Sequence, residues 1–142
     1  MSNLKVQGNA SGTGTHTLQS ANTNSNLTQT LPAADSVTLG YLNIPAVGAK
    51  TTSYTLTTAD VGKYVEVGSG GSITVPNSTF STGDAIVIFN NNSTTITITC
   101  SITTAYIAGT DADKDTMTLA ARGVASILFN SATVCVISGN VS

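Results

Sequence analysis

The segment from Asp84 to Cys100 constrains the fold of this chain more than any other. Residues 95–100 alternate strictly between threonine and an apolar residue, and a period of two is typical of a half-buried β-strand. Residues 85–89 are apolar at every position. The asparagine run at 90–92 suits a turn, because asparagine tolerates positive φ and hydrogen-bonds its own backbone. The segment therefore predicts a β-hairpin.

The two arms of the predicted hairpin differ in what they leave uncovered. Ile86 and Ile88 can face the same core as the isoleucines of residues 95–100. Val87 and Phe89 then lie on the opposite face, where a sheet with one core would carry polar residues. We expect these two side chains to be covered by a second layer, by the N-terminal segment or by another subunit.

Short strands separated by turn signals continue from residue 51 to the end of the chain. Their spacing of ~8–12 residues predicts an all-β domain over 51–142, a compact β-sandwich or barrel-like fold, and no segment has a helical period. Residues 58–63 are expected to form a single turn with Thr58 as its cap. Many of the expected strands carry threonine at alternate positions, so hydroxyls should cover their exposed faces. Outside the hairpin, the expected strands are 53–57, 64–67, 72–76, 105–109, 116–119, 124–129 and 133–138.

Residues 1–50 differ in composition from the rest of the chain and predict an extended N-terminal arm with short strands. The range is rich in Gly, Ser, Thr and Asn, and its few large apolar residues cannot form a core of their own. They can only be buried against the chain's own domain, a sister subunit or a larger assembly. Together with two residues of the hairpin, they form the candidate interface with another subunit or with a larger assembly. Its residues are Leu18, Leu27, Leu31, Leu39, Tyr41, Leu42, Ile44, Val87 and Phe89.

The charge content excludes several classes of partner. Charged residues make up 8% of the 142 residues and the net charge is −2, against about 25% charged residues in typical soluble proteins. We therefore expect binding to neither nucleic acid nor membrane. The start of the chain lacks the apolar core of a signal peptide, so synthesis in a cytoplasm is expected. Cys100 and Cys135 should then be buried and reduced, and a disulfide between adjacent strands is the alternative.

No motif in the sequence predicts a catalytic or cofactor site. Asp60-x-Gly62-Lys63 lacks the spacing of a phosphate-binding loop and is interpreted as a turn. The run Asp111–Asp115 could share a hard cation, but Lys114 interrupts it and a solvated turn is favoured. His16 has no partner arrangement and is interpreted as a surface residue. We expect no enzyme activity, no cofactor and no metal.

Several short motifs follow one another along residues 53–140. They are Tyr54-x-Leu56, Asp60-x-Gly62-Lys63-x-Val65, Ile73-Thr74-Val75-Pro76, Gly83-Asp84-x-Ile86-x-Ile88-x-Asn90, Ile96-x-Ile98, Thr118-Leu119, Gly123-x-Ala125 and Val136-Ile137-Ser138-Gly139. With these motifs, this part of the chain resembles a β domain that recurs in bacteriophage virion proteins. The N-terminal stretch from Gly12 to Pro32 is likewise similar to linkers of phage fibre and capsid-associated proteins.

The resemblance implies a structural role in a virion. It suggests a capsid decoration (cement) protein, made in the host cytoplasm and assembled as a homotrimer on the outer capsid surface, with the major capsid protein as its partner. The alternative that it leaves open is a tail-fibre or spike component that contributes to host-surface recognition. Either role implies a viral structural protein without enzyme activity.

Overall fold

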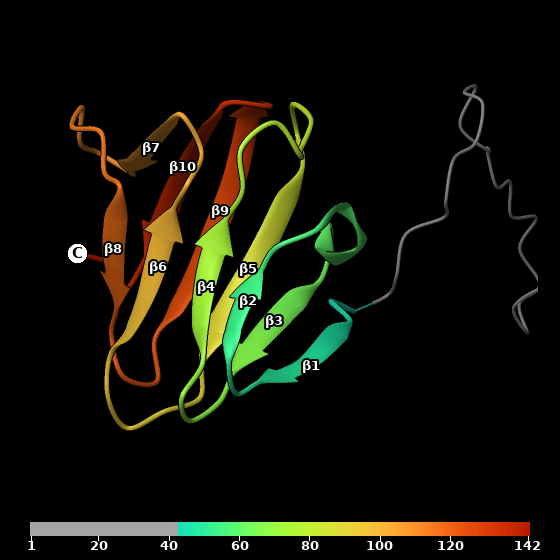
Figure 1. Ribbon diagram of the computed structural model, residues 1–142, viewed down its shortest axis with the longest axis vertical. Helices are drawn as coiled ribbons and strands as arrows, with labels where there is room; N and C mark the ends of the chain where they lie inside the picture. Colours follow the sequence, from blue (N-terminus) through green and yellow to red (C-terminus); the bar gives the residue numbers. More distant parts are fainter. Residues whose placement is uncertain (1–42) are drawn as a thin grey trace, which may run out of the picture. The chain divides into compact units, whose positions relative to one another are not determined.

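The computed structural model describes residues 43–142 and confirms the all-β prediction (Figure 1). Within this range, the only helical element is η1, a short 3-10 turn at Thr58–Asp60. The strands are β1 (Ala46–Lys50), β2 (Ser53–Thr55), β3 (Tyr64–Val67), β4 (Ser72–Val75), β5 (Ala85–Asn90), β6 (Ile96–Cys100), β7 (Thr104–Ile107), β8 (Thr116–Leu119), β9 (Val124–Ser131) and β10 (Val134–Gly139).

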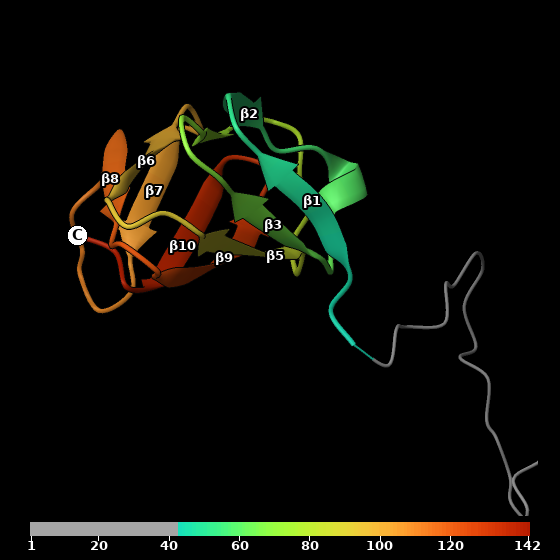
Figure 2. The same ribbon diagram turned by 90° about the horizontal axis from the view of Figure 1, so that it is seen from below.

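The strands form two facing sheets (Figure 2). Sheet A has six strands in the order β1-β3-β5-β9-β10-β7, and sheet B has four in the order β2-β4-β6-β8. Up to β6 the chain alternates between the sheets. Consequently β1, β3 and β5 are parallel neighbours in sheet A, and β2, β4 and β6 are parallel neighbours in sheet B.

The last strands end this winding with antiparallel pairs. β8 pairs antiparallel with β6. The hairpin of β9 and β10 is inserted into sheet A, where β9 pairs antiparallel with β5 and β10 pairs parallel with β7. This part of the chain therefore completes both sheets at the end opposite β1 and β2 (Figure 1).

The predicted hairpin at 84–100 is wrong, because β5 and β6 lie in different sheets. The asparagine run carries the chain across the core instead of reversing it within one sheet. Asn90 is fully buried, and its side-chain amide donates hydrogen bonds to the carbonyls of Thr94 and Ala120, each at 2.8 Å. Its Oδ1 accepts from the backbone amide of Asn92 at 3.0 Å. A side chain held from both sides in this way fixes a corner between two sheets.

The core lies between the two sheets and contains the isoleucines that the sequence analysis placed there. Ile86 and Ile88 point inward from sheet A, and Ile96 and Ile98 point inward from sheet B. All four are buried. Sharing a core did not require them to belong to one sheet, since residues on two facing sheets meet equally well.

Two boundaries differ from the sequence prediction. β1 lies at 46–50, within the range assigned to the arm, so the last part of that range belongs to sheet A. The residue that precedes η1 as its cap is Thr57 rather than Thr58, and its backbone amide donates to the Asp60 carboxylate at 2.7 Å. The remainder of the predicted arm, residues 1–42, lies outside the described residues.

Candidate interaction surfaces

The outer face of sheet A carries apolar side chains that nothing in the described part of the chain covers. Val124 and Leu128 of β9 are 44% and 52% exposed. Leu128 pairs laterally with Ala85 of β5 and Val136 of β10, while Val124 pairs with Phe89. We call the outward residues Val87, Phe89, Val124, Leu128 and Val136 the apolar face. They lie on the neighbouring strands β5, β9 and β10, and the outward Ser126, which pairs with Val87, stands between Val124 and Leu128 on β9.

The sequence analysis identified part of this face. Val87 and Phe89 point away from Ile86 and Ile88, as predicted, and both are half-buried. Ile44 is 56% exposed just before β1. The other predicted interface residues lie outside the described residues; they are Leu18, Leu27, Leu31, Leu39, Tyr41 and Leu42.

The exposed residues of β9 were missed. The signal for them was present, because the buried residues of β9 alternate with outward ones. With Ala125, Ile127 and Phe129 directed into the core, Val124 and Leu128 must point outward.

The outer face of sheet B consists entirely of hydroxyl-bearing residues. One row runs across all four strands, with Thr55 paired to Thr74, Thr74 to Thr99 and Thr99 to Thr116. A second row runs beside it. We call these outward residues the hydroxyl face; they are Ser53, Thr55, Ser72, Thr74, Thr97, Thr99, Thr116 and Thr118. The two outer faces of the domain therefore differ sharply in chemistry.

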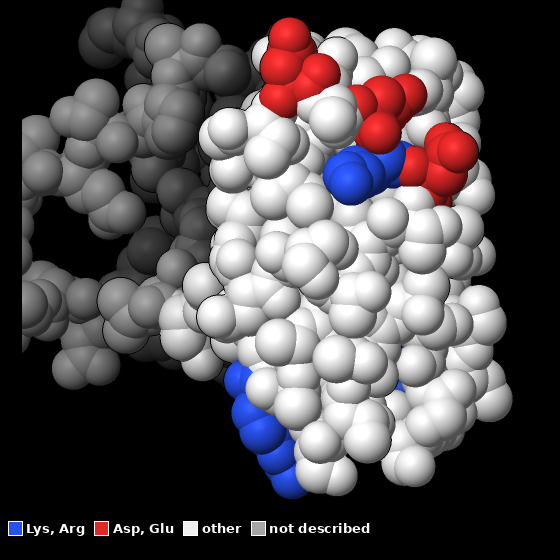
Figure 3. Space-filling model, turned by 90° about the vertical axis from the view of Figure 1, so that its left-hand side faces the viewer, with Lys and Arg blue, Asp and Glu red and all other residues white. Residues whose placement is uncertain are grey.

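Charged side chains gather near the loop between β7 and β8. Figure 3 shows a small group of acidic and basic side chains at one end of this side of the domain, above a surface that is largely uncharged. The segment is held to β7, because the Asp113 carboxylate accepts a hydrogen bond from the Ala105 amide at 2.8 Å and the Lys114 amide donates to the Ala105 carbonyl. Within residues 43–142, no group of three or more His, Cys, Asp or Glu side chains is arranged to hold a metal ion.

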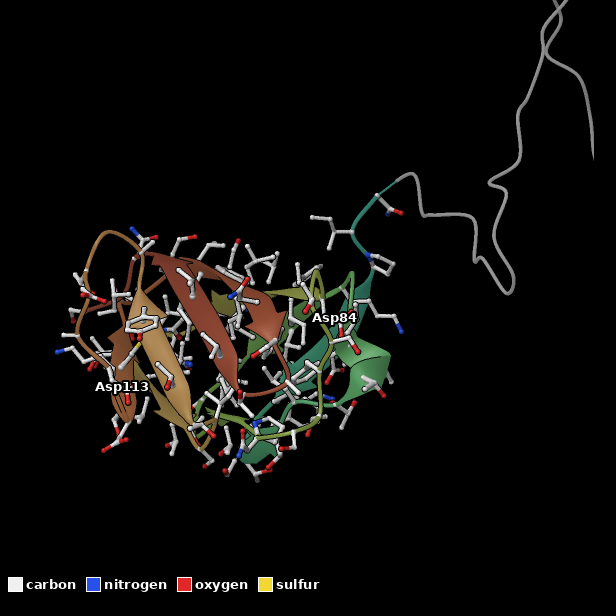
Figure 4. The ribbon with its side chains drawn as sticks, turned by 90° about the horizontal axis from the view of Figure 1, so that it is seen from above. Asp84 and Asp113 are labelled. Carbon is white, nitrogen blue, oxygen red and sulfur yellow. The ribbon has the colours of Figure 1, made fainter. Side chains whose placement is uncertain are left out.

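Like Asp113, Asp84 uses its carboxylate to hold a backbone amide, but it lies elsewhere in the domain (Figure 4). Its carboxylate accepts a hydrogen bond from the Ser81 amide at 2.9 Å, in the loop that precedes β5. Figure 4 shows Asp84 and Asp113 on opposite sides of the domain. The two carboxylates therefore do not form a pair.

The motif Asp60-x-Gly62-Lys63 is a turn, as predicted. Gly62 adopts a positive φ of 74°, a conformation that glycine reaches without strain. The Asp60 carboxylate is buried and accepts hydrogen bonds from the Tyr54 hydroxyl and from both the amide and the hydroxyl of Thr57. Burial and the hydrogen bond to Asp60 raise the pKa of Tyr54. These contacts hold η1 against the end of β2.

Cys100 and Cys135 are buried free thiols, in agreement with the sequence prediction. Burial raises the pKa of Cys100 to about 11 and that of Cys135 to about 12, and the negative charge of Asp113 adds to both shifts. Since the thiolate is the reactive form of cysteine, neither side chain is an activated nucleophile at neutral pH.

Comparisons with known proteins identify no relative of this chain. No family model, no curated protein and no solved structure matches it. Of the residues that the structure describes, none belong to a helix long and apolar enough to cross a membrane.

Proposed function

We propose that this protein is a structural component of a bacteriophage virion, a capsid decoration protein that binds and stabilises the head shell. The observation that supports the proposal best is the apolar face of sheet A. Val124 and Leu128 are large, exposed and adjacent to the half-buried Val87 and Phe89. Contiguous apolar patches on a protein surface mark sites of protein–protein contact. The resemblance to phage virion domains supplies the setting.

The proposed assembly is a homotrimer. In it, the arms over residues 1–50 pack on neighbouring subunits or on the major capsid protein at the outer capsid surface. Phage capsids offer three-fold and quasi-three-fold positions that a trimer matches by symmetry. The apolar face and the apolar residues of the arm are the two surfaces available for these contacts.

The proposed role is one of binding, without catalysis. Three groups of residues 43–142 that could react are buried in the fold. The Asp60 carboxylate accepts several hydrogen bonds, and the Cys100 and Cys135 thiols are buried and protonated. The outer faces of the sheets, in contrast, are open to a partner.

A tail-fibre or spike component is the second candidate, and the hydroxyl face favours it. An uncharged surface of aligned serine and threonine hydroxyls can exchange hydrogen bonds with the hydroxyls of a host-surface carbohydrate. Antibody labelling of the parent virion in the electron microscope separates the two candidates. Label on the head supports decoration, and label on the tail overturns it in favour of the fibre.

The role of the apolar face is tested by introducing a lysine there and comparing the variant with one that carries a lysine on the hydroxyl face. Sedimentation of the full chain at micromolar concentration should show a trimer, and Leu128→Lys should dissociate it and abolish binding to purified capsids. The matched control is Thr118→Lys, which adds the same charge to an exposed position of the hydroxyl face and should leave both properties unchanged. A monomeric wild-type protein would contradict the trimer, and an unaffected Leu128→Lys trimer would contradict the role of this face.

The role of the arm is tested by deletion. Removing residues 1–45 leaves β1 and every later strand in the chain, so the deletion variant should keep the circular dichroism spectrum of a β protein. It should no longer bind capsids. Undiminished binding by the folded variant would show that the arm is not an anchor.

A further inference from the structure

The hydroxyl face lies on a sheet whose strands pair without interruption. Register shifts occur between β1 and β3 and between β9 and β10, which belong to sheet A. The three pairings within sheet B have none. Apart from Tyr54, every side chain that points inward from the strands of sheet B is buried. The core therefore anchors these strands from below and holds the outward hydroxyls at fixed positions.

The two rows of the hydroxyl face form an array that repeats in two directions. In the second row, Ser53 pairs with Ser72 and Thr97 pairs with Thr118. Neighbouring strands lie ~4.8 Å apart, and alternate residues of one strand lie ~6.6 Å apart. The first spacing separates the hydroxyls along a row, and the second separates the two rows. Both spacings are close to the repeats of oxygen positions on a prism face of hexagonal ice.

The hydroxyls of this face are not used to hold the domain together. Among residues 43–142, the serine and threonine side chains that hydrogen-bond other protein groups all lie outside the hydroxyl face. A hydroxyl donates one hydrogen bond and accepts up to two, so it can take the place of a water molecule in a tetrahedral lattice. Within the described domain, the whole array is therefore available to an external ligand.

The charge and shape of the face match an uncharged, periodic ligand. Every outward position of β2, β4, β6 and β8 is serine or threonine, so no charged side chain holds a tight hydration shell there. The threonine methyl groups favour removal from liquid water. A single glycan chain would match the array along one direction only, whereas the surface of an ice crystal repeats in both. The array therefore fits ice better than a carbohydrate.

We propose that the hydroxyl face binds ice, with its two rows of hydroxyls bonded to the crystal surface directly and through bridging waters. Each contact is weak, but the array is already ordered by the sheet, so binding costs little ordering of side chains. A protein attached in this way blocks the addition of water to the crystal at that point. This inference does not depend on the virion role, since it concerns sheet B of the protein in solution.

Two measurements on the full chain test the proposal. At micromolar concentration, the wild-type protein should slow the coarsening of ice grains in a frozen solution, and it should be enriched in slowly grown ice over the remaining liquid. Thr99→Lys places a charge in the middle of the face, and at least about tenfold more protein should then be needed to slow coarsening. The control is Thr58→Lys, which replaces an exposed threonine of η1 outside the face and should match the wild type.

Circular dichroism should first show that both variants keep the β spectrum of the wild type. A wild-type protein that neither enters ice nor slows coarsening would overturn the proposal. Equal activity in wild type and Thr99→Lys would also overturn it, because ice would then contact another part of the chain. If the chain lacks ice activity but binds a neutral polysaccharide, and Thr99→Lys abolishes that binding, the face is a carbohydrate site and the proposal is wrong.

A lysine at the margin of the face gives a graded readout. Thr116 lies in the same row as Thr99 but on β8, the edge strand of sheet B. A lysine side chain there can bend away from the sheet and keep its ammonium group in water. Thr116→Lys should therefore lose less ice activity than Thr99→Lys. An equal or larger loss at the edge would contradict a contact that covers the whole array.

Discussion

Replacing Asn90 by alanine tests whether this one side chain holds the corner between the two sheets. The Asn90 amide donates to the Thr94 and Ala120 carbonyls at 2.8 Å, and more weakly to Leu119 at 3.3 Å. Its Oδ1 accepts from the Asn92 backbone amide at 3.0 Å. The Asn90 side chain thus ties the connection that leaves β5 to the end of β8, which is distant in sequence.

The size of the destabilisation expected for Asn90→Ala follows from these contacts. Each of the three shorter hydrogen bonds to backbone groups contributes about 1 kcal/mol net, and each buried polar group that loses its partner costs about 1–3 kcal/mol unless water replaces the bond. We expect Asn90→Ala to lower the free energy of unfolding by about 3–5 kcal/mol. That is a large fraction of the roughly 5–15 kcal/mol that stabilises a typical domain.

Urea denaturation followed by circular dichroism measures this change, provided that the slope with urea stays constant. The control is Asn91→Ala: the neighbouring Asn91 side chain is exposed and bonds Glu66 at the surface, so its loss should cost less than about 1 kcal/mol. Asn90→Asp removes the donors and buries a carboxylate among carbonyls. Its instability should lessen as pH falls toward about 4, where the carboxylate is protonated. A loss below about 1 kcal/mol in Asn90→Ala would refute the account.

Three further predictions concern the core and its backbone. Ile88→Ala should cost about 2–5 kcal/mol in urea denaturation, since Ile88 is fully buried; a loss well under 1 kcal/mol would contradict its inward placement. Burial raises the pKa of Cys100 and Cys135 from 9.0 to about 11 and about 12. Above about pH 9 the unfolded thiols ionise first, so the free energy of unfolding should fall by up to about 1.4 kcal/mol per pH unit and thiol. In Cys135→Ala, the free energy of unfolding should fall less steeply with pH than in the wild-type protein. Equal slopes in the two proteins would contradict the burial of this thiol. Gly139→Ala should lower the melting temperature, because Gly139 has φ of 123° and an added Cβ would clash with the Val124 carbonyl oxygen; an unchanged melting temperature would contradict this clash.

The sequence allowed the faces of the strands to be predicted but not their partners. Alternation in residues 95–100 correctly placed Ile96 and Ile98 inside, because side chains alternate across any strand whatever its neighbour. It carried no information on whether the next strand lay in the same sheet or the facing one. In the structure, the Asn90 side chain holds this connection by donating to the carbonyls of residues 94, 119 and 120. A local pattern cannot reveal the contacts with residues 119 and 120, which lie 29 and 30 residues away along the chain.

The candidate surfaces were predictable to a similar extent. Val87 and Phe89 stood out because both faces of residues 85–89 are apolar. Joining them to Leu128 required the pairing of β5 with β9, which only the structure provides. Likewise, the threonine content predicted hydroxyls on exposed strands, but the alignment of Thr55, Thr74 and Thr99 in one row depends on the parallel register of β2, β4 and β6.

The arrangement of the two outer faces fixes the orientation of the proposed assembly. The apolar face belongs to sheet A and the hydroxyl face to sheet B, and the core separates them. A subunit that docks through Leu128 and Val124 therefore presents its threonine rows to solvent on the opposite side. Hydroxyls remain well hydrated and carry no charge, whereas exposed leucine and valine side chains are stabilised by removal from water.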